Sequence, residues 1–277
     1  FDVVRNLLRS EPWSFAFVHE IGLDRLQHAL WRSVEEPDSD GYGALLDYHR
    51  LLDAEIGELL ELVPEETAVA VVSDHGARHL EGVFAINEWL VREGYLCTTE
   101  SPSKPGPVVS SRVDWARSRA WADGGYCGRV YLNVRGRQPE GILGPDEARR
   151  TRDEIRWKLE ALPGPDREPL GTAVYFPEEV YAARRGFPPD LIVYPGDLRF
   201  RCSGSVGFDR IFLDENDTGT DAANHAWEGM FLWAEPDVPG IGRVEGRHIL
   251  DVAPTILDHL NVPVPGNMPG ARLRAPA

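Results

Sequence analysis

The sequence predicts an α/β fold in which helices sandwich a mostly parallel sheet, with an α+β cap inserted into it. Residues 13–20 and 68–72 are short aromatic or β-branched runs typical of strands, and residues 44–63 between them carry leucines at helical spacing. A strand–helix–strand unit of this kind places its two strands in parallel. Residues 97–185 lack this regular alternation, which indicates an inserted cap.

The remaining elements follow from the same periodicities and from turn signals. The expected helices are 1–12, which ends at Pro12, 24–31, which has Asp near its start, 84–94, which ends at a glycine, 145–162 and 247–261. The expected strands are 129–134, 190–194 and 230–234, and the Pro-, Ser- and Gly-rich residues 101–111 are expected to form a loop. The chain then divides into a core at 1–96, the cap at 97–185 and the continued core at 186–277.

The composition of the 277 residues indicates a folded protein with a sizeable core, since 42% of them are hydrophobic. The formal net charge of −16 disfavours a nucleic acid polymer or an anionic membrane surface as a partner. Cys97, Cys127 and Cys202 are widely spaced, which indicates reduced thiols and a cytoplasmic location. No run of about 18 apolar residues occurs, so no membrane span is expected.

The strand predicted at 68–72 ends in the stretch Ser73-Asp74-His75-Gly76. A carboxylate and an imidazole are therefore adjacent at the carboxyl end of a strand, which is where open α/β sheets bind ligands. Asp and His together are suitable ligands for zinc, manganese or iron. We interpret Asp74 and His75 as candidate metal ligands.

Two further elements offer the same ligand types. Asp24 and His28 are four residues apart, which places both on one face of the predicted helix. His225 precedes the strand predicted at 230–234. Taken alone, each has a simpler interpretation, because Asp24 can be a solvated helix start with His28 packed beside Trp31, and His225 can be an ordinary loop histidine. Together with Asp74 and His75, these residues suit two neighbouring divalent ions with one set of ligands still missing. Two such ions can bind both the attacking and the leaving oxygen of a phosphoryl displacement.

The candidate ligands belong to a longer series of motifs that extends in order over almost the whole chain. The series is Asp24-Arg-Leu-Gln-His28, Ser73-Asp-His-Gly76, Gly82-Val-Phe-Ala-Ile-Asn87, Tyr131-Leu-Asn-Val-Arg-Gly-Arg137, Pro189-Asp-Leu191, His225-Ala-Trp-Glu-Gly-Met-Phe231 and Asp251-Val-Ala-Pro-Thr-Ile-Leu257. In this order the chain resembles the alkaline phosphatase superfamily, and within it the type I phosphodiesterase / nucleotide pyrophosphatase branch of phosphohydrolases and phosphomutases.

The resemblance implies two divalent metal ions, zinc in the first place and manganese or iron as alternatives. It assigns Asp24, His28 and His225 to one ion, and Asp74 and His75 to the other. It also implies a Thr or Ser nucleophile, which we expect upstream of this chain, because no matching motif occurs within it. The expected activity is hydrolysis of a small phosphorylated substrate by attack of the metal-activated hydroxyl on phosphorus.

Two alternatives remain open at this point. A phosphomutase would use the same intermediate and return the phosphoryl group to the substrate. A non-catalytic metal-binding or scaffold domain would lack the nucleophile altogether. The substrate, the metal and the oligomeric state, including association with an N-terminal segment, are also open.

Overall fold

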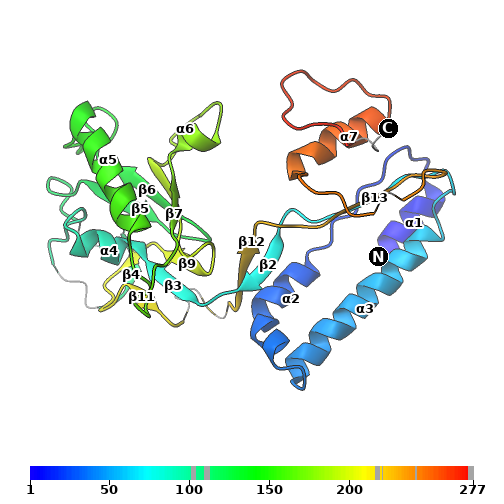
Figure 1. Cartoon of the computed structure of the whole chain (residues 1–277), viewed down its shortest axis with the longest axis horizontal. Helices are drawn as coiled ribbons and strands as arrows, with labels where there is room; N and C mark the ends of the chain where they lie inside the picture. The colour runs from blue at the N-terminus through cyan, green and yellow to red at the C-terminus, as the bar shows by residue number, and fades with distance from the viewer. Residues whose placement is uncertain (101–103, 109–112, 216–218, 220, 241, 274–277) are drawn as a thin grey trace. The chain divides into compact units, whose positions relative to one another are not determined.

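The computed structural model divides the chain into two compact units (Figure 1). The first unit contains Phe1–Ala16, Glu55–Gly76 and Trp227–Ala277, and the second contains Phe17–Ala54 and Ala77–Ala226. The described residues are 1–100, 104–108, 113–215, 219, 221–240 and 242–273. No helix within these ranges has the length and apolar character needed to cross a membrane.

The first unit combines helices with a two-stranded antiparallel sheet. Strand β1 pairs with β13 along its whole length. An ion pair of Arg5 with Glu55 joins α1 to the end of α3. The elements of this unit are α1 (Asp2–Ser10), the end of α3 (Asp40–Leu60), β1 (Val69–Val72), β13 (Phe231–Ala234), η3 (Ile249–Asp251) and α7 (Val252–His259).

The pairing of β1 with β13 continues one residue beyond both strands. The Ser73 main-chain N–H donates to the Met230 carbonyl at 2.9 Å, and the Met230 N–H donates to Ser73 Oγ at 2.6 Å. At Gly229 a Cβ atom would approach Ser73 Oγ to 2.8 Å, so no side chain fits there without a shift. The strand end that precedes Asp74 is therefore fixed by two hydrogen bonds to Met230.

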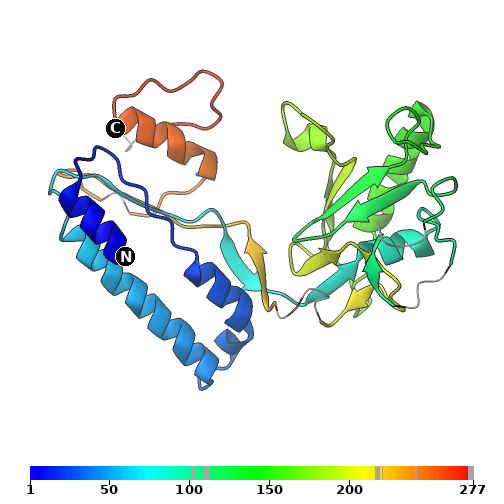
Figure 2. The same ribbon diagram turned by 180° about the vertical axis from the view of Figure 1, so that it is seen from behind.

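The second unit holds most of the strands, and its largest sheet is antiparallel with the order β5-β6-β8-β7. Helix α5 lies against this sheet (Figure 2). Smaller sheets have the orders β11-β3-β9, β12-β2 and β10-β4. The elements are α2 (Gly22–Leu30), η1 (Trp31–Glu35), the start of α3, β2 (Gly76–His79), β3 (Gly82–Ala85), α4 (Ile86–Arg92), β4 (Gly106–Pro107), β5 (Ala120–Asp123), β6 (Gly128–Leu132), α5 (Pro145–Glu160), β7 (Ala173–Tyr175), α6 (Pro177–Val180), β8 (Leu191–Tyr194), β9 (Phe200–Ser203), β10 (Ser205–Val206), β11 (Phe212–Leu213) and β12 (Ala223–Ala226).

The main hydrophobic core lies in the second unit, between the large sheet, α4 and α5. Its fully buried members include Phe84, Ile86, Leu90, Tyr95, Leu132, Ile155, Leu159 and Leu191. The side chain of Asn87 is buried in this core. Its amide NH2 donates to the carbonyls of Ala122 and Gly204, and its amide oxygen accepts from the Ala122 N–H. A buried amide whose donors and acceptor are all paired fixes α4 against β5.

Most predicted elements are confirmed within a few residues. The structure contains helices close to the predictions at 1–12, 24–31, 44–63 and 145–162, and strands close to those at 68–72, 129–134, 190–194 and 230–234. The helix predicted at 84–94 begins only at Ile86, since the residues before it form β3, and the one predicted at 247–261 is reduced to η3 and α7. Most of the loop predicted at 101–111 lies outside the described residues, and Gly106–Pro107 within it forms β4.

Two predictions are corrected. Residues 13–20 form no strand, and Phe15 and Phe17 in this run are exposed. The mixed α/β class is found, but among the strand pairs whose register the structure describes, β3 with β9 is the one parallel pair. Both corrections have the same physical reason. An apolar run predicts an extended conformation, but it does not specify whether a neighbouring strand pairs with it, or in which direction.

The cap boundaries stay a prediction. All of residues 97–185 fall within the second unit. The strands β5, β6 and β7 of this stretch share their sheet with β8, which lies beyond the predicted end of the cap.

Candidate metal centre

Helix α2 carries Asp24 and His28 one turn apart, and Glu20 fixes where this helix begins. The Glu20 carboxylate accepts hydrogen bonds from two main-chain N–H groups of the first turn and from the Tyr48 hydroxyl of α3, the last at 2.7 Å. The N–H groups at a helix start need such acceptors, and negative charge is favourable there. Glu20 therefore sets the position from which both candidate ligands project.

Replacing Glu20 with alanine is expected to lower the free energy of unfolding by about 1 kcal/mol, the usual effect of removing a helix cap. Burial alone raises the pKa of Glu20, but the hydrogen bonds from Tyr48, Gly22 and Leu23 outweigh it, so the pKa lies below its ordinary value of 4.5. The contribution of Glu20 to stability is then fully present above pH 4.5, the pKa in the unfolded chain. It is lost as the pH falls through the lower pKa of the folded state. Urea unfolding at pH 7 and at stepwise lower pH measures both effects. The exposed Glu65→Ala is the control, and an equal loss in both variants would contradict the capping role.

Strand β12 places His225 beside this helix. The neighbouring Asn224 is fully buried, and its amide donates to the Leu198 carbonyl at 2.7 Å. At the start of the strand, the Ala222 N–H donates to the carbonyl of His28 at 2.7 Å. The main chains of α2 and β12 are thus joined directly, which fixes the separation of the two histidines.

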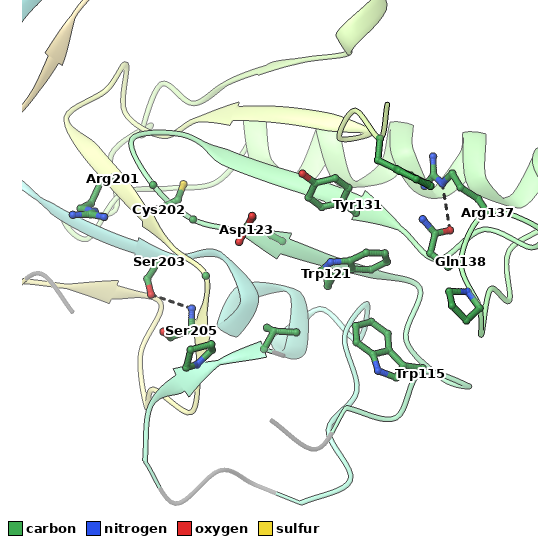
Figure 3. A pocket seen from close by; sticks show the side chains of 18 residues that line it. Trp115, Trp121, Asp123, Tyr131, Arg137, Gln138, Arg201, Cys202, Ser203 and Ser205 are labelled. Carbon is green, nitrogen blue, oxygen red and sulfur yellow. Dashed lines mark hydrogen bonds between the residues drawn. The ribbon is translucent and has the colours of Figure 1, made fainter. Parts of the chain in front are cut away.

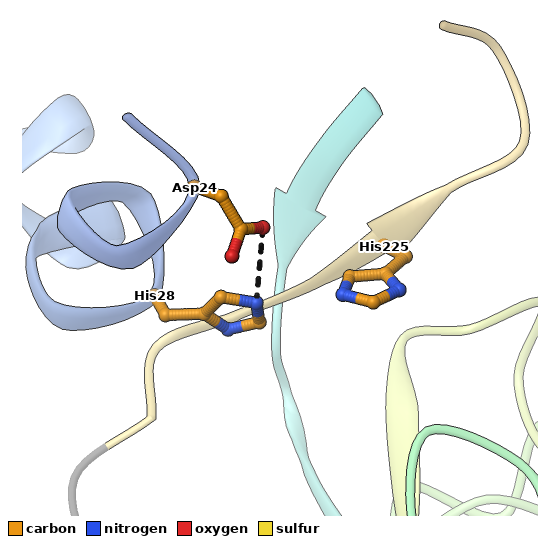
Figure 4. Close-up of side chains that lie close together, drawn as sticks. All are labelled: Asp24, His28 and His225. Carbon is orange, nitrogen blue, oxygen red and sulfur yellow. Dashed lines mark ion pairs between the residues drawn. The ribbon is translucent and has the colours of Figure 1, made fainter. Parts of the chain in front are cut away.

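Asp24, His28 and His225 come together in the structure (Figure 4). One ligand atom from each lies within 4.8 Å of the others, and all three residues are partly buried. His28 Nε2 is 3.5 Å from Asp24 Oδ1, and the two imidazole rings meet edge to face with centroids 5.5 Å apart. No other group of three His, Cys, Asp or Glu side chains meets this spacing within the described parts of the chain.

The orientation of His28 is set by Asp221. His28 Nδ1 lies 2.8 Å from Asp221 Oδ1, and a carboxylate can only accept a hydrogen bond. In the neutral imidazole the proton is therefore on Nδ1, which leaves the lone pair of Nε2 facing Asp24. Arg201 completes this link, since its guanidinium bonds the other Asp221 oxygen at 3.2 Å. Both Asp221 and Arg201 are largely buried, with 12% and 14% of their side chains exposed.

Tyr126 packs against both histidines. Its ring centroid lies 4.0 Å from that of His225 and 5.6 Å from that of His28. Burial, together with the nearby Asp221 carboxylate, raises the pKa of Tyr126, so its hydroxyl stays protonated at neutral pH. The guanidinium of Arg201 lies over the same ring, 5.9 Å from its centroid.

Sequence reasoning missed Asp221, Arg201 and Tyr126. Asp221 lies 193 residues from His28, and no local pattern predicts that contact. The only signal was a general rule: a histidine ligand needs an acceptor for its second ring nitrogen, often a carboxylate. This rule does not identify which residue provides it. The sequence alone did not identify Asp221 as that acceptor.

Asp74 and His75 lie in the first unit and pair with each other. His75 Nε2 is 3.5 Å from Asp74 Oδ2, and His75 Nδ1 donates to the Gly76 carbonyl at 2.9 Å. As at His28, the hydrogen bond leaves Nε2 facing a carboxylate. The Asp74 side chain is 83% exposed. The structure thus brings three of the five predicted ligands into one cluster and the other two into a pair of their own.

The cluster in the second unit fits a divalent metal. Two imidazole nitrogens and one carboxylate oxygen are a donor set that zinc, manganese and iron accept, and three protein ligands leave coordination positions for a substrate. The carboxylate–histidine link from Asp221 to His28 is the arrangement that usually supports a metal-binding imidazole.

Comparison with curated proteins gives no match. By contrast, the sequence model of the type I phosphodiesterase / nucleotide pyrophosphatase family matches residues 2–229. The match extends over well more than half of the 277 residues and includes all five predicted ligands. On this evidence, the chain belongs to the type I phosphodiesterase / nucleotide pyrophosphatase family.

Proposed function

We propose that this protein is a metal-dependent phosphoester hydrolase in which Asp24, His28 and His225 bind one divalent ion. Family membership implies hydrolysis of phosphoesters. The observation that carries the assignment of the metal is the hydrogen bond of His28 to Asp221, because it fixes the tautomer with Nε2 available as a ligand beside Asp24. Zinc suits this donor set best, with manganese and iron as alternatives.

A second ion is assigned to Asp74 and His75. In support, the His75 hydrogen bond to the Gly76 carbonyl leaves Nε2 facing Asp74. The nucleophile is taken to be a Thr or Ser hydroxyl, as in the resemblance described above. Bound divalent ions would lower the pKa of that hydroxyl and stabilise the charge that develops on the phosphoryl oxygens.

The residues around the cluster have separate tasks in this proposal. Asp221 keeps the proton of His28 on Nδ1, and Arg201 balances the charge of the buried Asp221 carboxylate. Tyr126 covers one side of both imidazoles and limits the access of water to them. None of these side chains needs to move a proton for the site to bind its metal.

The proposal is tested first by metal binding, which depends only on residues of this chain. The protein is stripped with a chelator, dialysed against zinc or manganese, and its metal content is measured by elemental analysis. Hydrolysis of bis(p-nitrophenyl) phosphate before and after reloading then measures the activity. Metal-dependent release of p-nitrophenol supports the hydrolase. With a sugar phosphate as the substrate, intramolecular phosphoryl transfer without free phosphate would favour a phosphomutase. In a protein that also carries the upstream Thr or Ser nucleophile, metal binding without either reaction would favour a non-catalytic metal-binding domain.

Replacing Asp221 with alanine is expected to weaken zinc binding by about 10- to 100-fold, the usual effect of removing the acceptor behind a histidine ligand. The dissociation constant is measured by competition with a chromophoric chelator. Asp53→Ala, an exposed carboxylate on α3, is the matched control and should bind zinc as the wild type does. An unchanged dissociation constant in Asp221→Ala, with the fold intact by circular dichroism, would show that His28 is not oriented in this way.

A further inference from the structure

The second unit contains a cavity of about 860 Å³ whose wall is built from aromatic rings (Figure 3). The rings of Trp121 and Tyr131 stack with centroids 5.6 Å apart, and Trp115 meets Trp121 edge to face at 5.3 Å. The side chains of Trp121 and Tyr131 oppose each other on the neighbouring strands β5 and β6. Since side chains alternate along a strand, the buried Ala122 and Val130 beside them point to the core, and the two rings occupy the other face.

The cationic groups of this cavity are already neutralised. Arg137 makes two hydrogen bonds to Asp190, at 2.8 and 2.5 Å, and Arg201 bonds Asp221 at 3.2 Å. A second phosphate or a carboxylate on the ligand would find no uncommitted positive charge in these two side chains. The cavity is therefore suited to an uncharged group.

Several polar atoms of the same wall are available for a ligand. Within the described residues, no hydrogen bond engages the indole N–H of Trp115 or Trp121, the hydroxyl of Tyr131 or Ser205, or the amide nitrogen of Gln138. None of these atoms is buried from solvent without a partner. A ligand that combines a ring for stacking with several hydroxyl groups satisfies the rings and these polar atoms together.

Two residues of the cavity wall connect it to the surroundings of the candidate metal centre in the same unit. Gly125 and Arg201 line the cavity, and each is bonded to a residue that lies around the cluster. Tyr126, which follows Gly125, packs on His225, and Arg201 bonds the carboxylate that orients His28. From Trp121 to Tyr126 the chain advances five residues, which span at most about 17 Å when extended.

We infer that this cavity binds the ring of the substrate, an uncharged and hydroxylated ring of the kind that a sugar presents, joined to phosphorus through one of its oxygens. The inference rests on the proposed function for the position of the phosphoryl group at the metal centre. The stacked rings take the face of the sugar, and the indole, hydroxyl and amide groups bond its hydroxyls.

The first experiment measures ring binding alone, without metal or phosphate, in the full chain. Saturation-transfer NMR with methyl α-glucoside should show transfer to the ring protons in the wild type. Trp121→Ala should lose this transfer and weaken binding roughly tenfold, as expected for one stacked ring. Trp157→Ala is the matched control, because that indole is 69% exposed on α5 and does not line the cavity. Equal transfer in Trp121→Ala and in the wild type would overturn the inference.

A second variant keeps the inference falsifiable if Trp121→Ala disturbs the fold. Tyr131→Phe retains the stacked ring and removes only the hydroxyl, so it should weaken glucoside binding several-fold and leave phenol binding unchanged. Phenol that binds the wild type as tightly as methyl α-glucoside would overturn the requirement for a hydroxylated ring.

The last experiment connects the cavity to the ester. In the zinc-loaded protein, glucose 1-phosphate should bind at least tenfold more tightly than inorganic phosphate, and Trp121→Ala should remove this difference. Because the glucoside experiment needs no metal and no reaction, a failure of the proposed hydrolysis leaves it unaffected. Glucoside binding without any advantage for glucose 1-phosphate would overturn the assignment of the cavity to the ester.

Discussion

Replacing His225 with alanine is expected to weaken binding of the divalent ion at the Asp24–His28–His225 cluster by more than about 100-fold. The loss exceeds the effect of removing a supporting residue because a ligand itself disappears from a site that has three. In the complete protein with its upstream nucleophile, hydrolysis of a phosphodiester by the metal-loaded form is expected to fall in parallel, since the ion that stabilises the phosphoryl oxygens is no longer held. Elemental analysis after gel filtration measures the metal, and p-nitrophenol release measures the activity.

The exposed His19 provides the matched control for this variant. His19→Ala removes an imidazole of the same second unit without touching the cluster, so it should retain the metal and the activity of the wild type. Full metal content in His225→Ala would show that the cluster is not the binding site. Loss of metal with full activity would show instead that the ion at this position has no part in the reaction.

Replacing Asp190 with alanine is expected to lower the free energy of unfolding by about 3 kcal/mol. Asp190 accepts two hydrogen bonds from Arg137 and one from the main-chain N–H of Leu132, at 2.8, 2.5 and 2.6 Å. Its side chain is only 16% exposed, so the variant leaves a half-buried guanidinium and a main-chain N–H without their acceptor. Guanidinium chloride unfolding followed by circular dichroism gives the midpoint for both proteins.

The control for Asp190 is another aspartate paired with an arginine. Asp146→Ala breaks the pair with Arg149, in which both side chains are more than 70% exposed. Solvated pairs contribute little, and the unfolding midpoint should hardly change. A similar shift in both variants would contradict the role assigned to burial at Asp190. A retained midpoint in Asp190→Ala would show that β6 and the turn after it do not depend on this bond.

Local signals explain why the helices were predicted well. Helix α5 begins at Pro145 and ends at Glu160, close to the predicted 145–162. Proline suits the first position of a helix, and the Glu147 carboxylate reaches back to accept the N–H of Gly144 at 2.8 Å. All of this information lies within one turn of the sequence. The strands are different, because a run such as Val69–Val72 does not specify that it pairs with a strand from the other end of the chain.

The candidate site likewise combines local spacings that the sequence predicts with long-range contacts that it does not. The spacing of Asp24 and His28 is a helical turn, so their common face could be predicted from the sequence. His225 was a candidate from its place before a predicted strand, the resemblance to the family assigned it to the same ion, and the structure places it with them. The contact of Asp221 with His28 depends on how β12 meets α2, and the packing of Tyr126 on His225 depends on the turn after β5. Such long-range contacts are fixed by packing rather than by local periodicity.

The hydrogen bond from the Ala222 N–H to the carbonyl of His28 has a consequence for how a metal ion is captured. Because this bond lies in the main chain, the two segments that carry the ligands are held together before any ion arrives. Capture then requires little loss of conformational entropy and no folding step, unlike the zinc sites whose apo form is unfolded. Calorimetry should accordingly give a small heat-capacity change on zinc binding, and stopped-flow uptake should have a single phase that is first order in zinc.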